Sequence, residues 1–518
     1  RTRAAESLAA WALHLKVPFL GALRETQAYA ASLASGATVA LAGAVIGTTL
    51  RDNLLIAPVG VLANEPSPTG QAGSVMLSAL LRIEDNVLWC QRQAVSLAGL
   101  SAHLMSTRIS GNEILGCRQG AITLLGLAGP GASMQVRGNS VNVSGPGVTA
   151  GVNGLWIADN ELVGATQGQS TALNGAGIHL RTGLDPTGAD QCQLLANQIS
   201  GFDDAGILIE SPVASLIVKL NIVQHCGNGI VSQGEAKGGS IAIENNALSD
   251  IGGARAAGAA EVFGIAVLRA ESAAVVGNTL HRIGVLATQA LLRVGVGAAA
   301  VQRLRVAGND VMDIGPPGNF NDAGFAVGVL VRSPFTEVEV SHNQVDRESV
   351  PLNQGGGRFL ALWIDEPGPN QLSSAIGAMT TIRVDASTTL TLGAGRVIIN
   401  RAGSFDVTGA VIVRGANASV HGNGLRARGT APAVRVTASG DCLFSDNRCE
   451  LRGNGNKLAV QLVSGIAIVS SNRVRGGDVS IDIESNPKTA TVLGNVTTGS
   501  IDLSGTLGAP WAPLNVRG

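Results

Sequence analysis

The sequence predicts an all-β protein: a single-stranded, right-handed parallel β-helix, a solenoid of about 14–16 coils, with a short N-terminal helical cap. The first observation is a recurring Asn that is followed two positions later by an apolar residue, mostly at intervals of 21 to 37 residues. The second is that positions three and five before the Asn are apolar or small, with few exceptions. That period of two indicates a strand with one buried face. Short strands repeated at such intervals are typical of solenoids, in which each strand pairs with its copy one coil away.

Each Asn of the repeat marks a corner between two short strands. We interpret the Asn as the residue that takes the left-handed conformation at the corner, because Asn tolerates it well. Stacked coils would also place the amides above one another in a hydrogen-bonded ladder. The repeat positions are Asn53, Asn86, Asn112, Asn139, Asn160, Asn197, Asn221, Asn246, Asn278, Asn309, Asn343, Asn423, Asn447, Asn472 and the weaker copy Asn495.

A second strand follows each corner and begins with Gly and alternating apolar residues. Examples are Gly177-Ile178-His179-Leu180, Gly206-Ile207-Leu208-Ile209 and Gly264-Ile265-Ala266-Val267. One coil therefore holds two or three short strands. Parallel crossover geometry favours the right-handed form.

The Asn-x-Ile/Val pattern, as in Gly111-Asn112-Glu113-Ile114, resembles that of the pectin-lyase-like superfamily. The resemblance covers about residues 45 to 500 and implies a right-handed parallel β-helix. It implies no single activity, because this fold carries lyases, hydrolases, epimerases, tailspikes and adhesins.

The chain divides into five segments. Residues 1–36 form an N-terminal helical cap or linker, because Leu8, Trp11 and Leu15 have helical spacing. Residues 37–345 form the β-helix, 346–378 a loop insertion rich in Pro and Gly, 379–505 the continued β-helix, and 506–518 an extended tail.

Composition excludes several partners. The chain has 36 Lys+Arg and 37 Asp+Glu, so bulk charge does not favour nucleic acid. The longest uncharged stretch near the N-terminus, residues 26–50, is too polar and glycine-rich for a transmembrane segment. The six cysteines form no Cys-x-x-Cys pair, so no metal site is predicted, and five of them fall at core positions of the repeat.

The candidate catalytic residues are Lys219, His179, Asp203 and Asp204. Paired carboxylates can serve as acid and base on a glycan or bind calcium. The alternative is that Asp203 and Asp204 make a turn before Gly206. No cofactor is expected, and calcium has no motif to support it.

Candidate carbohydrate-binding residues are Trp156 and Trp363, whose rings could stack on sugars.

A separate feature is an apolar stripe on outward positions of the middle coils, which suggests self-association or docking into a larger assembly. Its members are Leu208, Ile217, Val231, Ala242, Ala266, Ala274, Val276, Ala307 and Ala326.

These patterns predict a non-catalytic β-helical structural or surface-binding protein, such as a spike, fibre or adhesin-like component. The alternative is a polysaccharide lyase or another carbohydrate-active enzyme. A polysaccharide is the expected ligand in either case, and an extracellular or surface location is expected.

Overall fold

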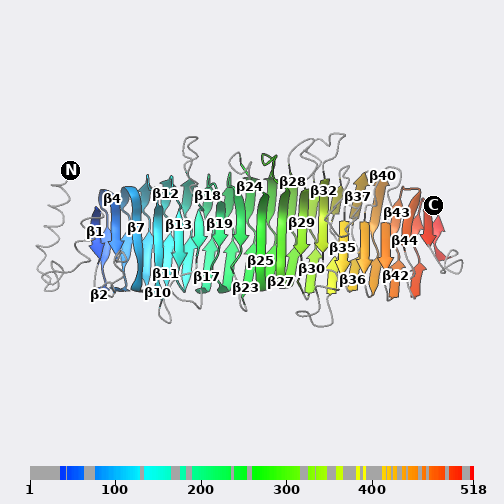
Figure 1. Cartoon of the computed structure of the whole chain (residues 1–518), viewed down its shortest axis with the longest axis horizontal. Coiled ribbons are helices and arrows are strands. Elements are labelled where there is room, and N and C mark those ends of the chain that lie inside the picture. Colours follow the sequence, from blue (N-terminus) through cyan, green and yellow to red (C-terminus); the bar gives the residue numbers. More distant parts are fainter. Residues whose placement is uncertain are drawn as a thin grey trace, which may run out of the picture. The chain divides into compact units, whose positions relative to one another are not determined.

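The structure is a computed structural model of residues 1–518. The described residues are 36–41, 44–63, 76–128, 133–164, 175–181, 189–234, 239–253, 260–315, 325–332, 334–335, 337–346, 358–365, 381–384, 389–392, 411–415, 417–421, 424–428, 434–438, 441–452, 458–462, 466–484, 489–503 and 514–517. They form no α-helix. The chain falls into two compact units, Arg1–Ile241 and Ala242–Gly518, each built of parallel strands (Figure 1).

A coil contains three short strands. One complete coil consists of β11 (Met134–Arg137), β12 (Ser140–Val143) and β13 (Val148–Gly151). Each strand pairs in parallel with its counterpart in the next coil. We call the strands that precede the ladder Asn face A, those that follow it face B, and the third set face C. The chain is thus a parallel β-helix, as predicted.

In the first unit each face is a column of successive strands. Face A contains β3 (Thr49–Arg51), β6 (Arg82–Glu84), β8 (Thr107–Ser110), β11, β14 (Leu155–Ala158), β17 (Ala189–Leu195) and β20 (Val213–Lys219). Face B contains the starts of β4 (Leu54–Ala63) and β7 (Val87–Met105), then β9 (Glu113–Leu115), β12, β15 (Glu161–Gly164), β18 (Gln198–Ser200) and β21 (Ile222–Gln224). Face C contains β1 (Ala37–Leu41), later parts of β4 and β7, then β10 (Gly120–Ala128), β13, β16 (Ile178–Leu180), β19 (Ala205–Ile209) and β22 (Asn228–Ser232). The short strands β2 (Ala44–Ile46) and β5 (Met76–Ala79) pair with each other, and β5 also pairs with the end of β7.

The second unit repeats this arrangement, and β23 (Ser240–Glu244) contains the boundary between the units. Face A contains the ends of β25 (Glu261–Val276) and β27 (Leu292–Ala307), then β30 (Glu337–Ser341), β33 (Thr381–Val384), β36 (Asn417–His421), β39 (Cys442–Ser445), β42 (Ile466–Ser470) and β45 (Thr489–Leu493). Face B contains β24 (Ala247–Ile251), β26 (Thr279–Ile283), β28 (Asp310–Ile314), β31 (Gln344–Asp346), β34 (Thr389–Leu392), β37 (Gly424–Arg428), β40 (Arg448–Arg452), β43 (Arg473–Arg475), β46 (Val496–Thr497) and β48 (Val516–Arg517). Face C contains the starts of β25 and β27, then β29 (Phe325–Arg332), β32 (Arg358–Asp365), β35 (Val411–Gly415), β38 (Val434–Ala438), β41 (Leu458–Leu462), β44 (Val479–Glu484) and β47 (Ser500–Leu503).

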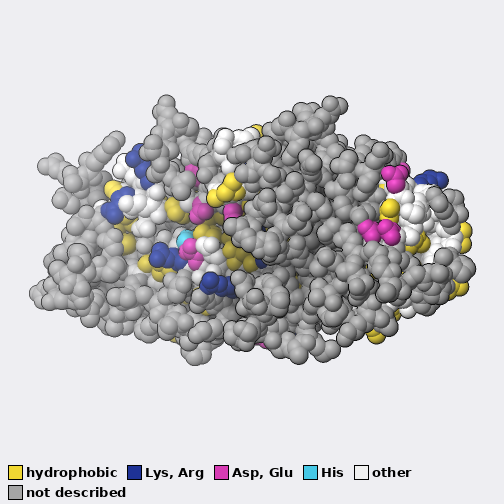
Figure 2. Space-filling model, turned by 45° about the vertical axis from the view of Figure 1, so that its right-hand side comes forward, with side chains coloured by type: hydrophobic (Ala, Val, Ile, Leu, Met, Phe, Trp, Pro, Cys, Tyr) yellow, Lys and Arg dark blue, Asp and Glu magenta, His cyan; other side chains and the backbone are white. Residues whose placement is uncertain are grey.

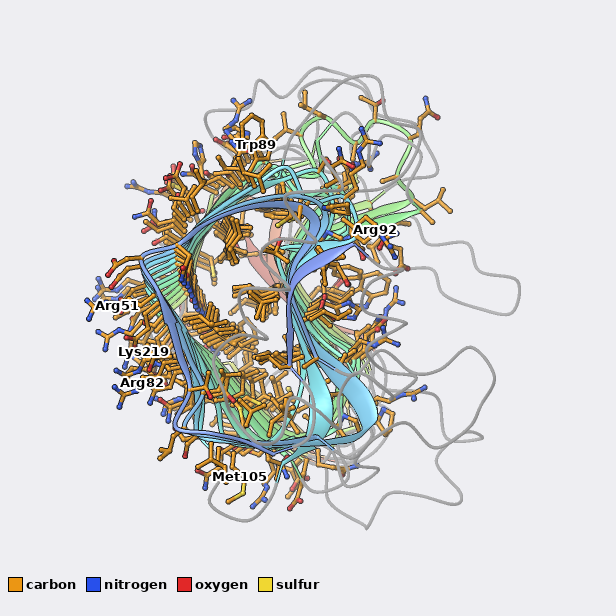
Figure 3. All side chains as sticks on the ribbon, turned by 90° about the vertical axis from the view of Figure 1, so that its left-hand side faces the viewer. Arg51, Arg82, Trp89, Arg92, Met105 and Lys219 are labelled. Atoms are coloured by element: carbon orange, nitrogen blue, oxygen red, sulfur yellow. The ribbon has the colours of Figure 1, made fainter. Side chains whose placement is uncertain are left out.

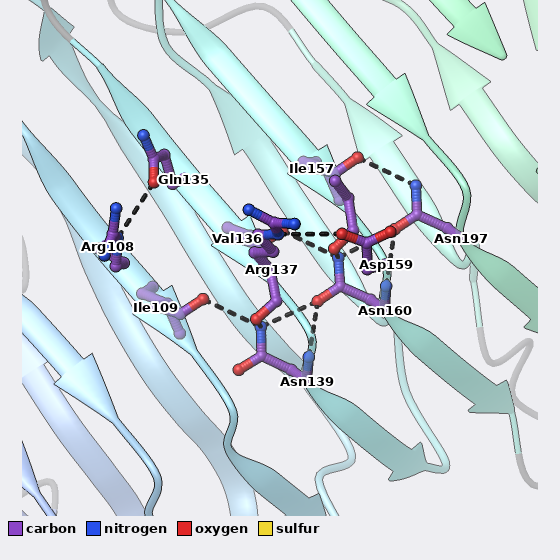
Figure 4. A network of polar contacts seen from close by, with 11 residues as sticks. Arg108, Ile109, Gln135, Val136, Arg137, Asn139, Ile157, Asp159, Asn160 and Asn197 are labelled. Carbon is purple, nitrogen blue, oxygen red and sulfur yellow. Dashed lines mark hydrogen bonds and ion pairs between the residues drawn. The ribbon is translucent and has the colours of Figure 1, made fainter.

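The predicted Asn ladder is present. The backbone N–H and the Nδ2 of Asn139 both donate to Asn160 Oδ1, at 3.0 and 2.9 Å, and Asn160 repeats this toward Asn197 (Figure 4). Asn139 Nδ2 also donates to the carbonyl oxygen of Ile109 at 3.0 Å. The described ladder segments are Asn53-Asn86-Asn112-Asn139-Asn160-Asn197-Asn221 in the first unit and Asn246-Asn278-Asn309-Asn343 and Asn447-Asn472-Asn495-Asn515 in the second. Asn423 lies outside the described residues.

The conformation of the corner corrects one prediction. The residue with positive φ is the one before the ladder Asn, as in Gly138 (62°), Asp159 (56°) and Ala196 (52°), and not the Asn itself. The Asn amide must align with the amides of neighbouring coils, so its neighbour makes the left-handed turn. This explains why Gly and Asp are frequent before the Asn, since both tolerate positive φ better than most residues.

The interior of the coils is filled as the repeat predicts, including its cysteines. All six cysteines are buried and free. Burial raises the pKa of Cys90 to about 11 and the pKa of Cys117, Cys226 and Cys442 to about 12. A thiol with such a pKa is protonated near pH 7 and reacts slowly, so these residues act as small apolar side chains.

Two of the predicted boundaries fall partly on described residues. The predicted loop 346–378 contains β32, which pairs with β29 and β35, so this range supplies a coil strand. The predicted tail 506–518 contains β48, which pairs with β46. Alternation of Leu360, Leu362 and Ile364 was the signal for β32, and the surrounding Pro and Gly residues obscured it. The predicted cap, residues 1–36, lies outside the described residues except for Gly36.

Candidate functional site

The candidate site lies on the outer side of face C in the first unit. His179 is the central residue of β16, between Ile178 and Leu180, which point into the coil and are buried. In register with His179 lie Thr149 of β13 on one side and Leu208 of β19 on the other. Because side chains alternate along a strand, His179 points outward from the coil.

A carboxylate from the next coil holds the histidine. His179 Nε2 lies 2.8 Å from Oε2 of Glu210, which follows β19 directly. The other carboxylate oxygen, Oε1, accepts a hydrogen bond of 3.1 Å from Gln233 Nε2. Three successive coils thus supply His179, Glu210 and Gln233. Figure 2 shows a histidine beside acidic and basic side chains on the described part of one face.

Asp204 belongs to the same group. Burial raises the pKa of its carboxyl; the positive charge that His179 can carry opposes this rise, and the negative charge of Glu210 adds to it. The Asp204 carbonyl accepts hydrogen bonds from the backbone N–H of Asn228, at 2.7 Å, and from Asn228 Nδ2, at 3.2 Å. A carboxyl with a raised pKa beside a histidine–carboxylate pair is an arrangement that suits acid–base chemistry.

The raised pKa of Asp204 predicts that the difference in stability between the parent protein and Asp204→Asn depends on pH. Folded Asp204 keeps its proton to a higher pH than unfolded Asp204, whose ordinary pKa is 3.8. Folding therefore takes up a proton above that pH, and stability falls as pH rises through the folded pKa. Asp204→Asn should raise the urea midpoint of unfolding at pH 7 and leave it unchanged at pH 3. Glu161→Gln, at an exposed position of face B, should change neither. An equal shift of the Asp204→Asn midpoint at both pH values would contradict the prediction.

One of the predicted catalytic residues, Lys219, lies on another face. Lys219 belongs to face A, where it pairs in register with Leu195, and it points outward on the same face as Arg51 and Arg82 (Figure 3). Asp203 influences the buried thiol of Cys226, whereas the charges that act on Asp204 are those of His179 and Glu210. The structure therefore joins His179 with Asp204 and leaves Lys219 on another face.

Sequence reasoning missed Glu210 and Gln233. Both lie four residues after the glycine that opens a face C strand, as Gly206 does for Glu210 and Gly229 does for Gln233. His179 lies two residues after Gly177. Aligning the coils on these glycines would have placed Glu210 diagonally across from His179, within reach of its ring.

Trp156 of face A is half-buried under an ion pair. The Arg137 guanidinium lies 5.2 Å from the centroid of its ring, and Arg137 Nε donates to Asp159 Oδ2 at 2.9 Å (Figure 4). The guanidinium thus covers one face of the indole. Cation–π packing accounts for this contact without a ligand, and sugar stacking at Trp156 stays a prediction.

Trp363 lies in β32 of the second unit, within a packed cluster. Its ring centroid is 6.2 Å from that of Phe325, and the Arg332 guanidinium lies 5.6 Å from its ring. It is buried with Val327 and Leu330.

Part of the predicted apolar stripe is buried as well. The buried members are Leu208, Val231, Ala266, Ala307 and Ala326. These positions point outward from a strand and are nevertheless packed, so this part of the stripe is no exposed docking surface.

Comparisons with known proteins do not assign this chain to a family. No protein-family model, curated protein or solved structure matches the chain. Among the described residues, no group of three or more His, Cys, Asp or Glu side chains is placed to hold a metal ion. Within the same residues, no helix has the length and apolar character needed to cross a membrane.

Proposed function

We propose that this chain is a non-catalytic β-helical structural or surface-binding protein, a spike, fibre or adhesin-like component of a cell or particle surface. The observation that carries the proposal is the Asn ladder, which joins seven successive coils of the first unit from Asn53 to Asn221. A ladder of buried amides with parallel pairing on every face stiffens the coils along their stacking direction. Such a scaffold suits a role in which outward side chains are displayed at regular spacing.

We propose that this surface binds a polysaccharide and that the protein has an extracellular location. The outward rows of face A carry arginine, glutamine and tryptophan side chains, as in Arg108, Gln135 and Trp156, one coil apart. Such groups donate hydrogen bonds and stack on sugars. Membership of the pectin-lyase-like superfamily is part of this proposal and rests on the coil pattern.

The group around His179 favours a second candidate function, a polysaccharide lyase or related carbohydrate-active enzyme. In a lyase, His179 held by Glu210 would take the proton beside the uronate carboxyl of the sugar. The glycosidic C–O bond would break as the sugar double bond forms, and protonated Asp204 would give its proton to the leaving oxygen. The raised pKa of Asp204 supports its assignment as the acid.

The two functions differ in one assay. Incubation with a panel of neutral and uronic-acid polysaccharides should give no unsaturated product by absorbance and no new reducing ends, while sedimentation with insoluble polysaccharides should show binding. Product that disappears in Asp204→Asn and Glu210→Gln, but persists in the Glu161→Gln control, would replace the first function by the second. Product that persists in all three variants would contradict the first function and place the chemistry at another site.

A further inference from the structure

Arginine is concentrated on face B in three successive strands of the second unit. These strands, β37, β40 and β43, lie side by side (Figure 1). Their sequences, Gly-Leu-Arg-Ala-Arg, Arg-Cys-Glu-Leu-Arg and Arg-Val-Arg, contain six arginines and one glutamate. The whole chain, in contrast, has a net charge of −1. This part of face B is therefore a basic surface on a chain that is close to neutral.

Three of these arginines have described side chains, and all three are exposed. Arg448 of β40 and Arg473 of β43 are partners in register, and Arg475 lies two residues beyond Arg473 in β43. Cys449 and Val474, which follow the first two, point into the coil and are buried. Neighbouring strands are about 4.8 Å apart, and residues two apart in one strand are separated by about 6.6 Å. We call Arg448, Arg473 and Arg475 the arginine triangle.

The chain itself does not neutralise the arginine triangle. Within the described part of the chain, none of its three members makes an ion pair, whereas Arg137 of face A pairs with an aspartate. Glu450, the register partner of Arg475, is half-buried and has an interaction partner of its own. Like charges directly opposite each other on neighbouring strands are destabilising. An anion bound between Arg448 and Arg473 would relieve this repulsion.

We infer that the arginine triangle binds an acidic polysaccharide, one that carries carboxylate or sulfate groups along its chain. The inference rests on the polysaccharide binding proposed above, and it adds the sign of the ligand's charge and a second place of binding. A guanidinium group holds an oxyanion through two parallel N–H donors. Because Arg448 and Arg473 repeat along the stacking direction, they can bind acidic groups that repeat along an extended polymer.

A nucleic acid fits this surface less well. Proteins that bind single strands stack the bases on aromatic side chains, and the sequences of β37, β40 and β43 contain no aromatic residue. Binding to a duplex depends on neutralising many phosphates, and the chain has no excess of positive charge for this. An anionic lipid surface would also attract arginines, so the experiment includes it as a competing outcome.

Three polymers with one backbone test the inference with the full chain: dextran, carboxymethyl-dextran and dextran sulfate. The two acidic polymers should bind at least about tenfold more tightly than dextran at low salt, and added NaCl should weaken their binding. Arg448→Gln, Arg473→Gln and Arg475→Gln should each weaken the binding of dextran sulfate about threefold, and the triple variant about thirtyfold. The matched control is Arg118→Gln, which removes the same charge at an exposed position of the first unit and should leave the Kd unchanged.

The outcomes separate this inference from the proposed function. Equal binding of dextran and dextran sulfate would overturn the inference and leave polysaccharide binding intact. Binding of the acidic polymers that is the same in the triple variant and in Arg118→Gln would also overturn it, because the ligand would then lie elsewhere. If none of the polymers binds, the proposed polysaccharide binding fails as well. Sedimentation with phosphatidylglycerol vesicles, without binding to any polymer, would assign the arginine triangle to a lipid surface instead.

Discussion

Asn160→Ala is expected to lower the free energy of unfolding by about 3–5 kcal/mol, because it interrupts the ladder at a fully buried position. Asn160 Oδ1 accepts hydrogen bonds from the backbone N–H and the Nδ2 of Asn139. Its Nδ2 donates to the carbonyl oxygens of Val136 and Ala158 and to Asn197 Oδ1, each at 2.9 Å. Alanine removes all five of these side-chain bonds at a buried position, where water cannot readily replace them. Urea unfolding should show a lower midpoint, and amide hydrogen exchange should be fastest in the coils from β11 to β18.

The first rung of the same ladder provides the control. Asn53 also donates from Nδ2 to the next Asn, Asn86, at 2.9 Å, but its side chain is exposed. Water can replace these bonds, so Asn53→Ala should cost about 1 kcal/mol or less. Equal losses for Asn53→Ala and Asn160→Ala would show that burial does not set the strength of the ladder.

The sequence predicted the fold well because its repeat has a simple physical basis. Apolar residues at fixed distances from the Asn must stack in the interior, and an amide repeated at one corner must meet its copies. What it did not reveal was the conformation of the corner, because Asn tolerates positive φ as Asp159 and Gly138 do. Either the ladder Asn or the residue before it could take the positive φ at a corner. Which of the two does so depends on the direction in which the Asn amide must point, and the stacked coils determine that direction.

The candidate site was predicted in part. His179 and Asp204 were singled out as outward or acidic residues, and the structure places them in one electrostatic group. Glu210 was missed because it lies 31 residues from His179, and the two meet only when the coils are aligned on Gly177 and Gly206. The burial of stripe residues such as Leu208 and Ala266 could not be predicted either. A period of two tells which side chains point outward from a strand, but it does not tell whether an outward side chain is covered by other residues.

A column of glycines on face C sets how closely successive coils approach. A Cβ atom on Gly264 would lie 2.7 Å from the carbonyl oxygen of Gly295, and one on Gly295 would lie 2.6 Å from the carbonyl oxygen of Gly328. The Gly295 Cβ would also lie 2.5 Å from Val311 Cγ1. The obstruction is a backbone carbonyl held in the ladder of parallel strands, and it cannot rotate away as a side chain can.

Gly295→Ala is therefore expected to destabilise the protein by about 2–4 kcal/mol in urea unfolding, through overpacking against fixed backbone. Gly253→Ala in the same unit is the matched control. Among the residues that the structure describes, no atom lies within 4 Å of its Cβ position, and Gly253 has no positive φ. Alanine there restricts the unfolded chain without a clash, so it should raise stability by about 0.4–1 kcal/mol. If Gly295→Ala lowers the free energy of unfolding and Gly253→Ala raises it, then Gly295 is required because a larger side chain does not fit there. A stabilising effect at both positions would mean that the coils can move apart, and that the glycine column does not set their spacing.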